Sequence, residues 1–164
     1  MSDTKLYEIA AAVGVALKAR KLTLATAESC TGGWIGEACT AVPGSSDWFE
    51  RGFITYTNIA KREMLGVKAE TLDKFGAVSE ETVEAMVGGA LAHSHAQVAI
   101  AVSGVAGPSG GTPAKPVGTV CIAWQLERGT AIVETQRFDG DREAVRRQSV
   151  ERALNGVLAL LASA

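Results

Sequence analysis

The sequence is poor in cysteine and has no excess of charge of one sign, and each shortage excludes a class of protein. Its three cysteines, Cys30, Cys39 and Cys121, are an odd number without a CxxC pair. That count argues against a disulfide framework or a structural zinc site. The formal net charge of −2 gives no overall attraction to nucleic acid, which usually requires a basic surface. We therefore expect no nucleic-acid partner.

Long apolar runs and targeting signals are also missing. No stretch approaches the roughly 20 apolar residues of a membrane-spanning helix. The first ten residues, MSDTKLYEIA, do not combine a basic start with an apolar core, as a secretory signal does. We therefore expect a cytoplasmic protein without membrane contact.

The apolar residues that are present suffice for one globular domain. A chain of 164 residues, 47% of them hydrophobic, can bury a substantial core. The order of helical and strand patterns predicts an α/β fold: a single layered domain, residues 1–164, with a mixed β-sheet packed by helices on its faces. The predicted helices are 4–20, 34–41, 59–65, 69–75, 79–93 and 141–161, and the predicted strands are 22–26, 53–57, 98–102, 118–126 and 131–138.

The first candidate site is the segment 26–33, TAESCTGG, between a predicted strand and a predicted helix. Backbone N–H groups at such a turn, here those of residues 31–33, would stabilise a phosphate, a carboxylate or a developing oxyanion. Ser29 or Cys30 could serve as a nucleophile beside these donors. A small buried residue is the alternative interpretation of Cys30.

A second candidate is the glycine-rich loop that follows the predicted strand 98–102. Ligands of open α/β sheets bind beyond the carboxyl ends of the strands, so we expect this loop and the turn 26–33 to line one cleft. Ser103, Gly104 and Gly107 are the expected contacts, and a merely flexible connection is the alternative. Neither segment fits the dinucleotide fingerprint or the phosphate-binding P-loop.

A third candidate joins Tyr56 to Lys61 across a strand-to-helix junction. A lysine at that place is usually solvated, and Arg62 and Glu63 beside it favour that interpretation. In a partly buried cleft, however, desolvation would lower the pKa of Lys61 and let it act as a base toward a serine. The tyrosine hydroxyl could then relay the proton.

The last helix carries two arginines on its apolar stripe. The stripe runs through Val150, Leu154, Val157 and Leu161, and extends backward to Arg146 and Arg142. These arginines require a negative partner, either an internal carboxylate such as Asp139 or Glu28, or a substrate phosphate or carboxylate. Three other arginines are expected to face solvent: Arg137, Arg147 and Arg152.

Taken together, five segments resemble the CinA C-terminal domain family, in order and across almost the whole chain. The resemblance is to the stand-alone form of that domain and implies an amidohydrolase that converts nicotinamide mononucleotide (NMN) to nicotinate mononucleotide and ammonia, in pyridine-nucleotide salvage, without metal or cofactor. The matching segments are TAESCTGG (26–33), RGFITYTNIAK (51–61), GAVSEETV (76–83), SGVAGPSGGTPAKPVGTV (103–120) and FDGDREAVRRQ (138–148).

The resemblance also implies roles for single residues. The family's serine nucleophile falls on Ser29, its tyrosine on Tyr56 and its lysine, the general base, on Lys61. We assign the 5′-phosphate to the two helix arginines and the pyridinium charge to Glu28. The expected substrate-binding residues are Glu28, Thr31, Gly32, Gly33, Ser103, Gly104, Gly107, Arg142 and Arg146.

Three alternatives stay open at this point. The chain could be a non-catalytic nucleotide-binding module, an interaction domain in DNA uptake or repair, or an amidase that uses Cys30. His93 and His95 lie near a helix end without further ligands, so we expect no metal site. The apolar, Ala-rich first and last helices could pair across a two-fold axis, so we expect a homodimer.

Overall fold

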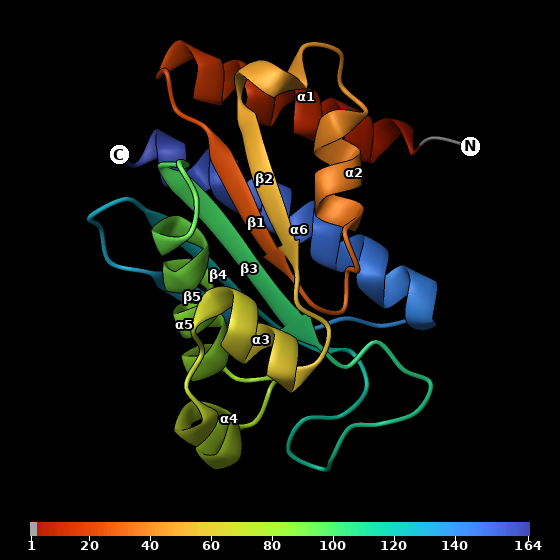
Figure 1. Cartoon of the computed structure of the whole chain (residues 1–164). Coiled ribbons are helices and arrows are strands. Elements are labelled where there is room, and N and C mark those ends of the chain that lie inside the picture. Colours follow the sequence, from red (N-terminus) through yellow and green to blue (C-terminus); the bar gives the residue numbers. More distant parts are fainter. Residues whose placement is uncertain (1–2) are drawn as a thin grey trace.

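The computed structural model describes residues 3–164, which form a five-stranded sheet between two layers of helices (Figure 1). The predicted α/β fold with a mixed sheet is confirmed. The strands are β1 (Leu24–Glu28), β2 (Phe49–Ile54), β3 (Val98–Gly104), β4 (Thr119–Leu126) and β5 (Ile132–Arg137). The helices are α1 (Thr4–Ala19), α2 (Trp34–Thr40), α3 (Asn58–Leu65), α4 (Ala69–Phe75), α5 (Glu80–Ala92) and α6 (Arg142–Ala162), with a short 3-10 helix at Ser45–Asp47.

The strand order brings the segments after three strands to one edge of the sheet. The order is β2-β1-β3-β4-β5, and β1 runs parallel to both of its neighbours. The carboxyl ends of β1, β2 and β3 therefore lie side by side, as ligand sites of open α/β sheets require. Figure 1 shows the arrowhead of β3 and the long loop after it at this edge, with α3 nearby. The predicted hairpin of β4 and β5 is antiparallel.

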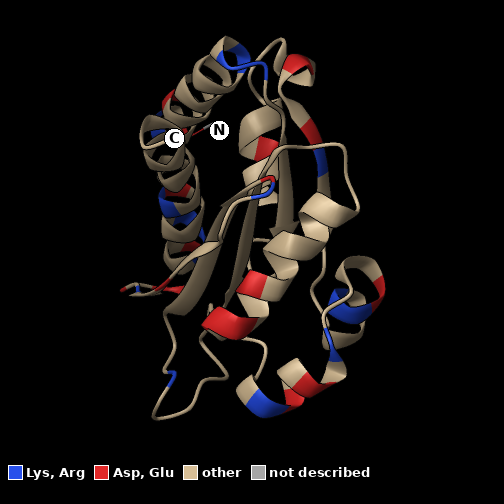
Figure 2. Ribbon diagram, turned by 90° about the vertical axis from the view of Figure 1, so that its left-hand side faces the viewer, with Lys and Arg blue, Asp and Glu red and all other residues tan. Residues whose placement is uncertain are grey.

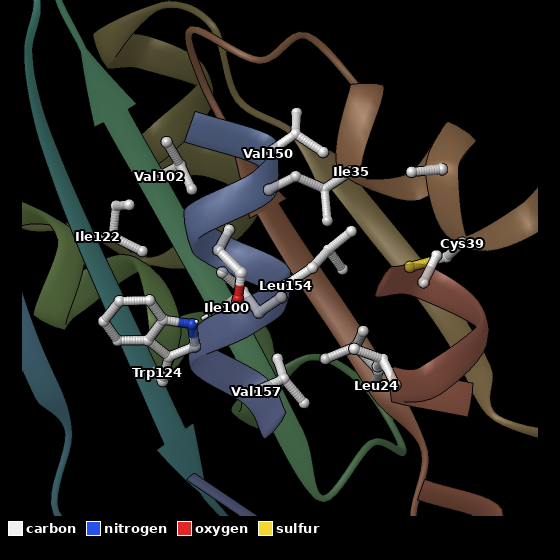
Figure 3. Close-up of a cluster of buried hydrophobic side chains, with 14 of the residues drawn as sticks. Leu24, Ile35, Cys39, Ile100, Val102, Ile122, Trp124, Val150, Leu154 and Val157 are labelled. Atoms are coloured by element: carbon white, nitrogen blue, oxygen red, sulfur yellow. Dashed lines mark hydrogen bonds between the residues drawn. The ribbon is translucent and has the colours of Figure 1, made fainter. Parts of the chain in front are cut away.

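The two faces of the sheet carry side chains of different size. Helices α1, α2 and α6 cover the face with the larger side chains. There the indole of Trp124 packs against α6 and donates a hydrogen bond of 2.8 Å to the carbonyl of Ala153 (Figure 3). The large residues shown in Figure 3 come from strands and helices alike: Leu24, Ile35, Ile100, Val102, Ile122, Val150, Leu154 and Val157.

The opposite face is lined with alanines, which lets α5 approach the sheet closely. Ala27, Ala99, Ala101 and Ala123 are all fully buried beneath it. On its outer side α5 contacts α3, and a Cβ on Gly89 would collide with the carbonyl oxygen of Leu65. This close packing fixes the position of α3 beside the carboxyl edge of the sheet.

Two strands differ in position from the sequence prediction. β1 was expected at 22–26 but runs to Glu28, because Ala27 and Glu28 continue the pairing with β2 and β3. Glutamate is depleted in strands, and here the carboxylate of Glu28 is hydrogen-bonded inside the protein. β2 was expected at 53–57 but spans Phe49–Ile54, with Glu50 and Arg51 obscuring the apolar pattern of this edge strand.

The distribution of charged residues and the length of the helices agree with what we expected from the sequence. In Figure 2, both blue and red segments occur on several helices, while α5 carries red segments alone near its N-terminal end. Within residues 3–164, no helix is both long and apolar enough to cross a membrane. The first and last helices pack against each other within the chain, where Lys5 pairs with Glu151 at 2.8 Å. The expected homodimer stays a prediction.

Candidate active site

The turn after β1 and the loop after β3 line one cavity, as the strand order requires. The cavity has a volume of about 370 Å³, within the range of small-molecule sites. The turn is tied to β3 because the N–H of Ser29 donates to the carbonyl of Val102 at 3.0 Å. Of the predicted site residues, the ones that line this cavity are Ser29, Tyr56, Lys61, Ser103, Gly104, Gly107 and Arg142.

Lys61 and Ser29 are in direct contact inside the protein. Lys61 lies on α3 and is only 1% exposed, and its Nζ is 3.1 Å from the Oγ of Ser29. The same nitrogen donates to the backbone carbonyls of Thr55 and Tyr56, at 3.1 and 3.2 Å. A neutral amine has two N–H donors and one lone pair. In the structure Nζ donates to Ser29 Oγ, and the hydroxyl of Ser29 donates to the carbonyl of Tyr56 at 3.4 Å. Once the amine is neutral and its two donors are directed at carbonyls, its lone pair faces Ser29 Oγ and can take the hydroxyl proton.

The surroundings of Lys61 favour its neutral form. Burial lowers the pKa of this lysine from its ordinary value of 10.5, because the charged form loses its hydration. No carboxylate among residues 3–164 lies within 4.0 Å of the ammonium nitrogen to offset that loss. The lysine therefore has the environment of a general base, rather than that of a solvated surface residue.

Glu28 lies beneath the turn, which differs from its expected place beside a substrate. Its carboxylate accepts five hydrogen bonds, from the hydroxyls of Thr26 and Thr31 and from the backbone N–H groups of residues 33, 35 and 36. The side chain is 1% exposed and does not reach the cavity. Glu28 thus caps the N-terminus of α2, where a negative charge is stabilised by the helix dipole.

The cap leaves a different set of backbone donors at the turn from the one predicted. The N–H of Gly33 donates to Glu28, and that of Gly32 donates to the carbonyl of Ser29 at 3.0 Å. The N–H groups of Cys30 and Thr31 have no acceptor among the described residues 3–164. Cys30 lines the cavity directly after Ser29, so its N–H is the donor available to an oxyanion formed on Ser29, whereas Thr31 is fully buried and does not line the cavity.

Cys30 lines the cavity but is a poor nucleophile. Burial raises the pKa of its thiol to about 12, so that almost no thiolate exists near neutral pH. The thiol is 5% exposed and belongs to the hydrophobic core that packs against α2 and α6. The small-buried-residue interpretation of Cys30 therefore fits the structure better than the alternative of a cysteine amidase.

Arg142 stands at the rim of the cavity, where three segments meet. As the first residue of α6 it donates to the carbonyl of Gly107 at 2.8 Å and to the phenol oxygen of Tyr56 at 3.1 Å. It is exposed, and no ion pair engages it within residues 3–164. A guanidinium so oriented can receive an anionic group of a ligand.

Arg146 does not line the cavity, although it shares a helix face with Arg142. Its guanidinium instead donates to the backbone carbonyls of Cys30 and Thr31, at 2.9 and 3.2 Å. The expectation that both arginines meet an acid or a substrate anion thus differs from the structure. Arg147 and Arg152 are half-buried rather than solvated, since they pair with Asp3 and Glu134 respectively.

Several cavity residues were not indicated by the sequence. The side chain of Asn58 lines the cavity, because the neighbouring Thr57, rather than Asn58, caps α3. Ala77 and Val78 contribute from the segment before α5, whereas residues 109–111 belong to the glycine-rich loop that was expected to line the cleft. None of the lining residues that the structure describes carries a carboxylate, and within residues 3–164 no cluster of three or more His, Cys, Asp or Glu could hold a metal ion.

Known proteins are similar to this chain in both sequence and fold. Residues 6–161 match the family model of the CinA C-terminal domain. Nicotinamide-nucleotide amidohydrolase PncC of Escherichia coli (strain K12) is 53% identical over 154 residues, 94% of this chain and 93% of that protein. The protein of the same name from Pseudomonas putida is 56% identical over 152 residues, 93% of this chain and 94% of that one. The competence/damage inducible protein CihA from Agrobacterium tumefaciens superposes with a TM-score of 0.94 at 44% identity, covering 98% of both chains.

Proposed function

The chain belongs to the CinA C-terminal domain family, and on that premise we propose that it hydrolyses the carboxamide of NMN to nicotinate mononucleotide and ammonia. Relatives more than half identical over nearly their full length carry the name of this activity. The observation that supports it most directly is the buried contact of 3.1 Å between Lys61 Nζ and Ser29 Oγ. We place the enzyme in the cytoplasm.

Acylation begins with the neutral amine of Lys61. As the Oγ of Ser29 attacks the carboxamide carbon, its proton passes to Nζ, which the carbonyls of Thr55 and Tyr56 hold in place. The oxygen of the tetrahedral intermediate becomes negative and accepts a hydrogen bond from the N–H of Cys30, which borders the cavity. When the C–N bond breaks, the Lys61 ammonium returns the proton to the leaving nitrogen, and ammonia departs.

Deacylation repeats these steps with water. The nicotinoyl ester on Ser29 is attacked by a water molecule, whose proton goes to Lys61. Collapse of the second tetrahedral intermediate returns that proton to Ser29 Oγ and releases the carboxylic acid of nicotinate mononucleotide, which gives its proton to the ammonia released in acylation. Atoms and charge balance, since each cycle converts one carboxamide and one water to one carboxylate and one ammonium ion.

Substrate binding would rely on Arg142, the positive side chain at the rim of the cavity. We assign the 5′-phosphate to Arg142, whose position at the rim leaves room for the pyridine ring beside Ser29. Ser103, Gly104 and Gly107 then contact the ribose or the phosphate. Because Glu28 is engaged beneath the turn, no carboxylate neutralises the pyridinium ring. A cationic ring near Lys61 lowers the pKa of the lysine further, which keeps the base neutral.

The test is ammonia release from NMN by the purified protein, with nicotinate mononucleotide identified as the second product. Wild type should turn over in the presence of EDTA, while Ser29→Ala and Lys61→Met should lose activity. Hydroxylamine added to wild type should divert part of the product to the hydroxamate, since it captures an acyl-enzyme. Saturable NMN binding without any turnover would favour a non-catalytic nucleotide-binding module instead.

A further inference from the structure

Arg146 contacts the back of the Ser29 turn rather than the cavity. It lies one helical turn after Arg142 on α6, and its Nε and Nη2 donate to the carbonyls of Cys30 and Thr31, at 2.9 and 3.2 Å. Its guanidinium also lies over the ring of Trp34, 5.4 Å from the ring centroid, at the start of α2. This arginine therefore joins α6 to the turn and to the helix that follows it.

Apart from its contact with the ring of Trp34, the guanidinium of Arg146 is directed at backbone carbonyls. Within residues 3–164 no carboxylate lies within 4.0 Å of it, whereas Arg147 and Arg152 on the same helix each have an acidic partner. A guanidinium is a strong donor that usually pairs with a carboxylate or a phosphate, so a half-buried one whose hydrogen-bond acceptors are backbone carbonyls is unusual. It indicates that the orientation of those carbonyls matters.

Peptide geometry connects these carbonyls to the reaction. The C=O of Thr31, which Arg146 binds, and the N–H of Gly32 belong to one planar trans peptide, so they point in opposite directions. Holding the oxygen of Thr31 toward Arg146 therefore directs the N–H of Gly32 away from Arg146, and it donates to the carbonyl of Ser29 at 3.0 Å. That carbonyl shares a planar peptide with the N–H of Cys30, which borders the cavity and has no acceptor within residues 3–164.

Arg146 also strengthens the donor that it orients. A positive group on a carbonyl oxygen polarises the whole peptide unit and makes its N–H a better donor, as in cooperative hydrogen-bond chains. We infer that Arg146 is a positioning residue, which holds the Thr31–Gly32 peptide and, through the hydrogen bond from Gly32, orients and polarises the Ser29–Cys30 peptide so that the N–H of Cys30 stabilises the oxyanion formed on Ser29. This inference depends on the proposed amidase activity, and it removes Arg146 from the phosphate site.

The experiment compares Arg146→Lys and Arg146→Ala with two controls on the same helix. Arg152→Ala removes a guanidinium that also lies over a tryptophan ring, 5.2 Å from the centroid of Trp124, but far from the turn in the fold. Arg142→Ala removes the rim arginine. Steady-state kinetics with NMN are measured for every variant, after circular dichroism and thermal unfolding have established that it is folded.

We expect Arg146→Ala to lower kcat by about 10²-fold, the scale of a misplaced or lost oxyanion donor, while KM stays within about twofold. Arg146→Lys keeps the charge, but an ammonium group lacks the planar fork of N–H donors that binds both carbonyls, so the kcat of this variant should fall as well. Added guanidinium should restore part of the kcat of Arg146→Ala and none of the activity lost in Arg142→Ala. Arg152→Ala should keep the wild-type kcat and KM.

Several results would overturn the inference. An increase in KM with unchanged kcat would assign Arg146 to substrate binding, and unchanged kcat and KM would leave it no part in the reaction. If Arg146→Ala does not fold, Arg146→Lys decides between these outcomes. A wild-type protein that releases no ammonia from NMN would refute the proposed function itself, and the inference with it.

Discussion

The phenol oxygen of Tyr56 accepts a hydrogen bond of 3.1 Å from Nη2 of Arg142, although the two residues are 86 positions apart in the sequence. This contact joins the segment after β2 to the start of α6 across the rim of the cavity. The backbone carbonyl of Tyr56, by contrast, contacts Lys61 and Ser29 at the base of the cavity. One residue thus contributes to two parts of the site through different atoms.

Replacing Arg142 should weaken binding of the phosphorylated substrate specifically. A hydrogen bond to a charged group contributes about 1.5–3 kcal/mol, so Arg142→Ala should raise KM for NMN by roughly 10–100-fold with a small change in kcat. Nicotinamide riboside, which lacks the phosphate, should be a poor substrate that the substitution does not weaken further. Equal losses with both substrates would show that Arg142 does not recognise the phosphate.

Tyr56→Phe distinguishes a role in binding from a role in proton transfer. The exposed phenol contacts Arg142, so its loss should cost less than about 1 kcal/mol and raise KM by no more than about fivefold. The backbone carbonyl that supports Lys61 is retained in this variant. A fall in kcat by orders of magnitude would instead support the role predicted from the sequence, proton relay by the tyrosine hydroxyl.

Ser29 and its neighbour Cys30 should differ sharply when each is replaced by alanine. Ser29→Ala removes the nucleophile and should lower kcat by more than about 10⁴-fold. Cys30→Ala keeps the backbone N–H, and the thiol with its raised pKa has no chemical role, so activity should stay within about tenfold of wild type. The assay is ammonia release, and inactivation of Cys30→Ala with survival of Ser29→Ala would reverse the assignment.

The neutral form of Lys61 should appear in the pH dependence of the reaction. Because burial lowers its pKa from 10.5, kcat/KM should rise with pH through that lowered value and then level off. Lys61→Arg keeps a permanent charge and cannot act as a base, so it should be inactive over the whole range. A wild-type profile without an acidic limb would contradict the assignment of Lys61 as the base.

The same lysine should make stability depend on pH. Between its lowered pKa in the folded protein and the ordinary value of 10.5, the unfolded chain binds more protons than the folded one. The free energy of unfolding therefore rises with pH in that window, and below it the folded protein carries the full cost of a buried ammonium. Urea unfolding of wild type and Lys61→Met should show their difference shifting in favour of wild type as pH rises. A constant difference would contradict the prediction.

Glu28 should matter for the stability of the turn more than for substrate affinity. Glu28→Ala leaves the N–H groups of Gly33, Ile35 and Gly36 without their acceptor and should lower the free energy of unfolding by roughly 2–4 kcal/mol. Glu37→Gln changes an exposed carboxylate in the first turn of the same helix and is the matched control. Thermal unfolding measures both, and equal small shifts would contradict the capping role.

The sequence by itself determined much of the fold and of the chemistry. The alternation of elements, the apolar stripe of α6 and the apolar run of β3 all depend on local periodicity, which is readable without a structure. The segment containing Ser29 was prominent because it places hydroxyl groups and a thiol beside two glycines between a strand and a helix, and the segment containing Tyr56 and Lys61 because it follows another predicted strand. We expected Ser29 and Lys61 to meet, because segments that follow neighbouring parallel strands lie at the same edge of a sheet.

Only the tertiary structure decided how the polar side chains are used. Glu28, Arg146 and Arg142 were all predicted to contact the substrate, yet the first caps α2, the second binds backbone carbonyls and the third alone lines the cavity. Periodicity shows which face of a helix is buried, but not which atoms it meets there. The partner of a buried charge is set by the packing of distant segments, and that packing appears only in three dimensions.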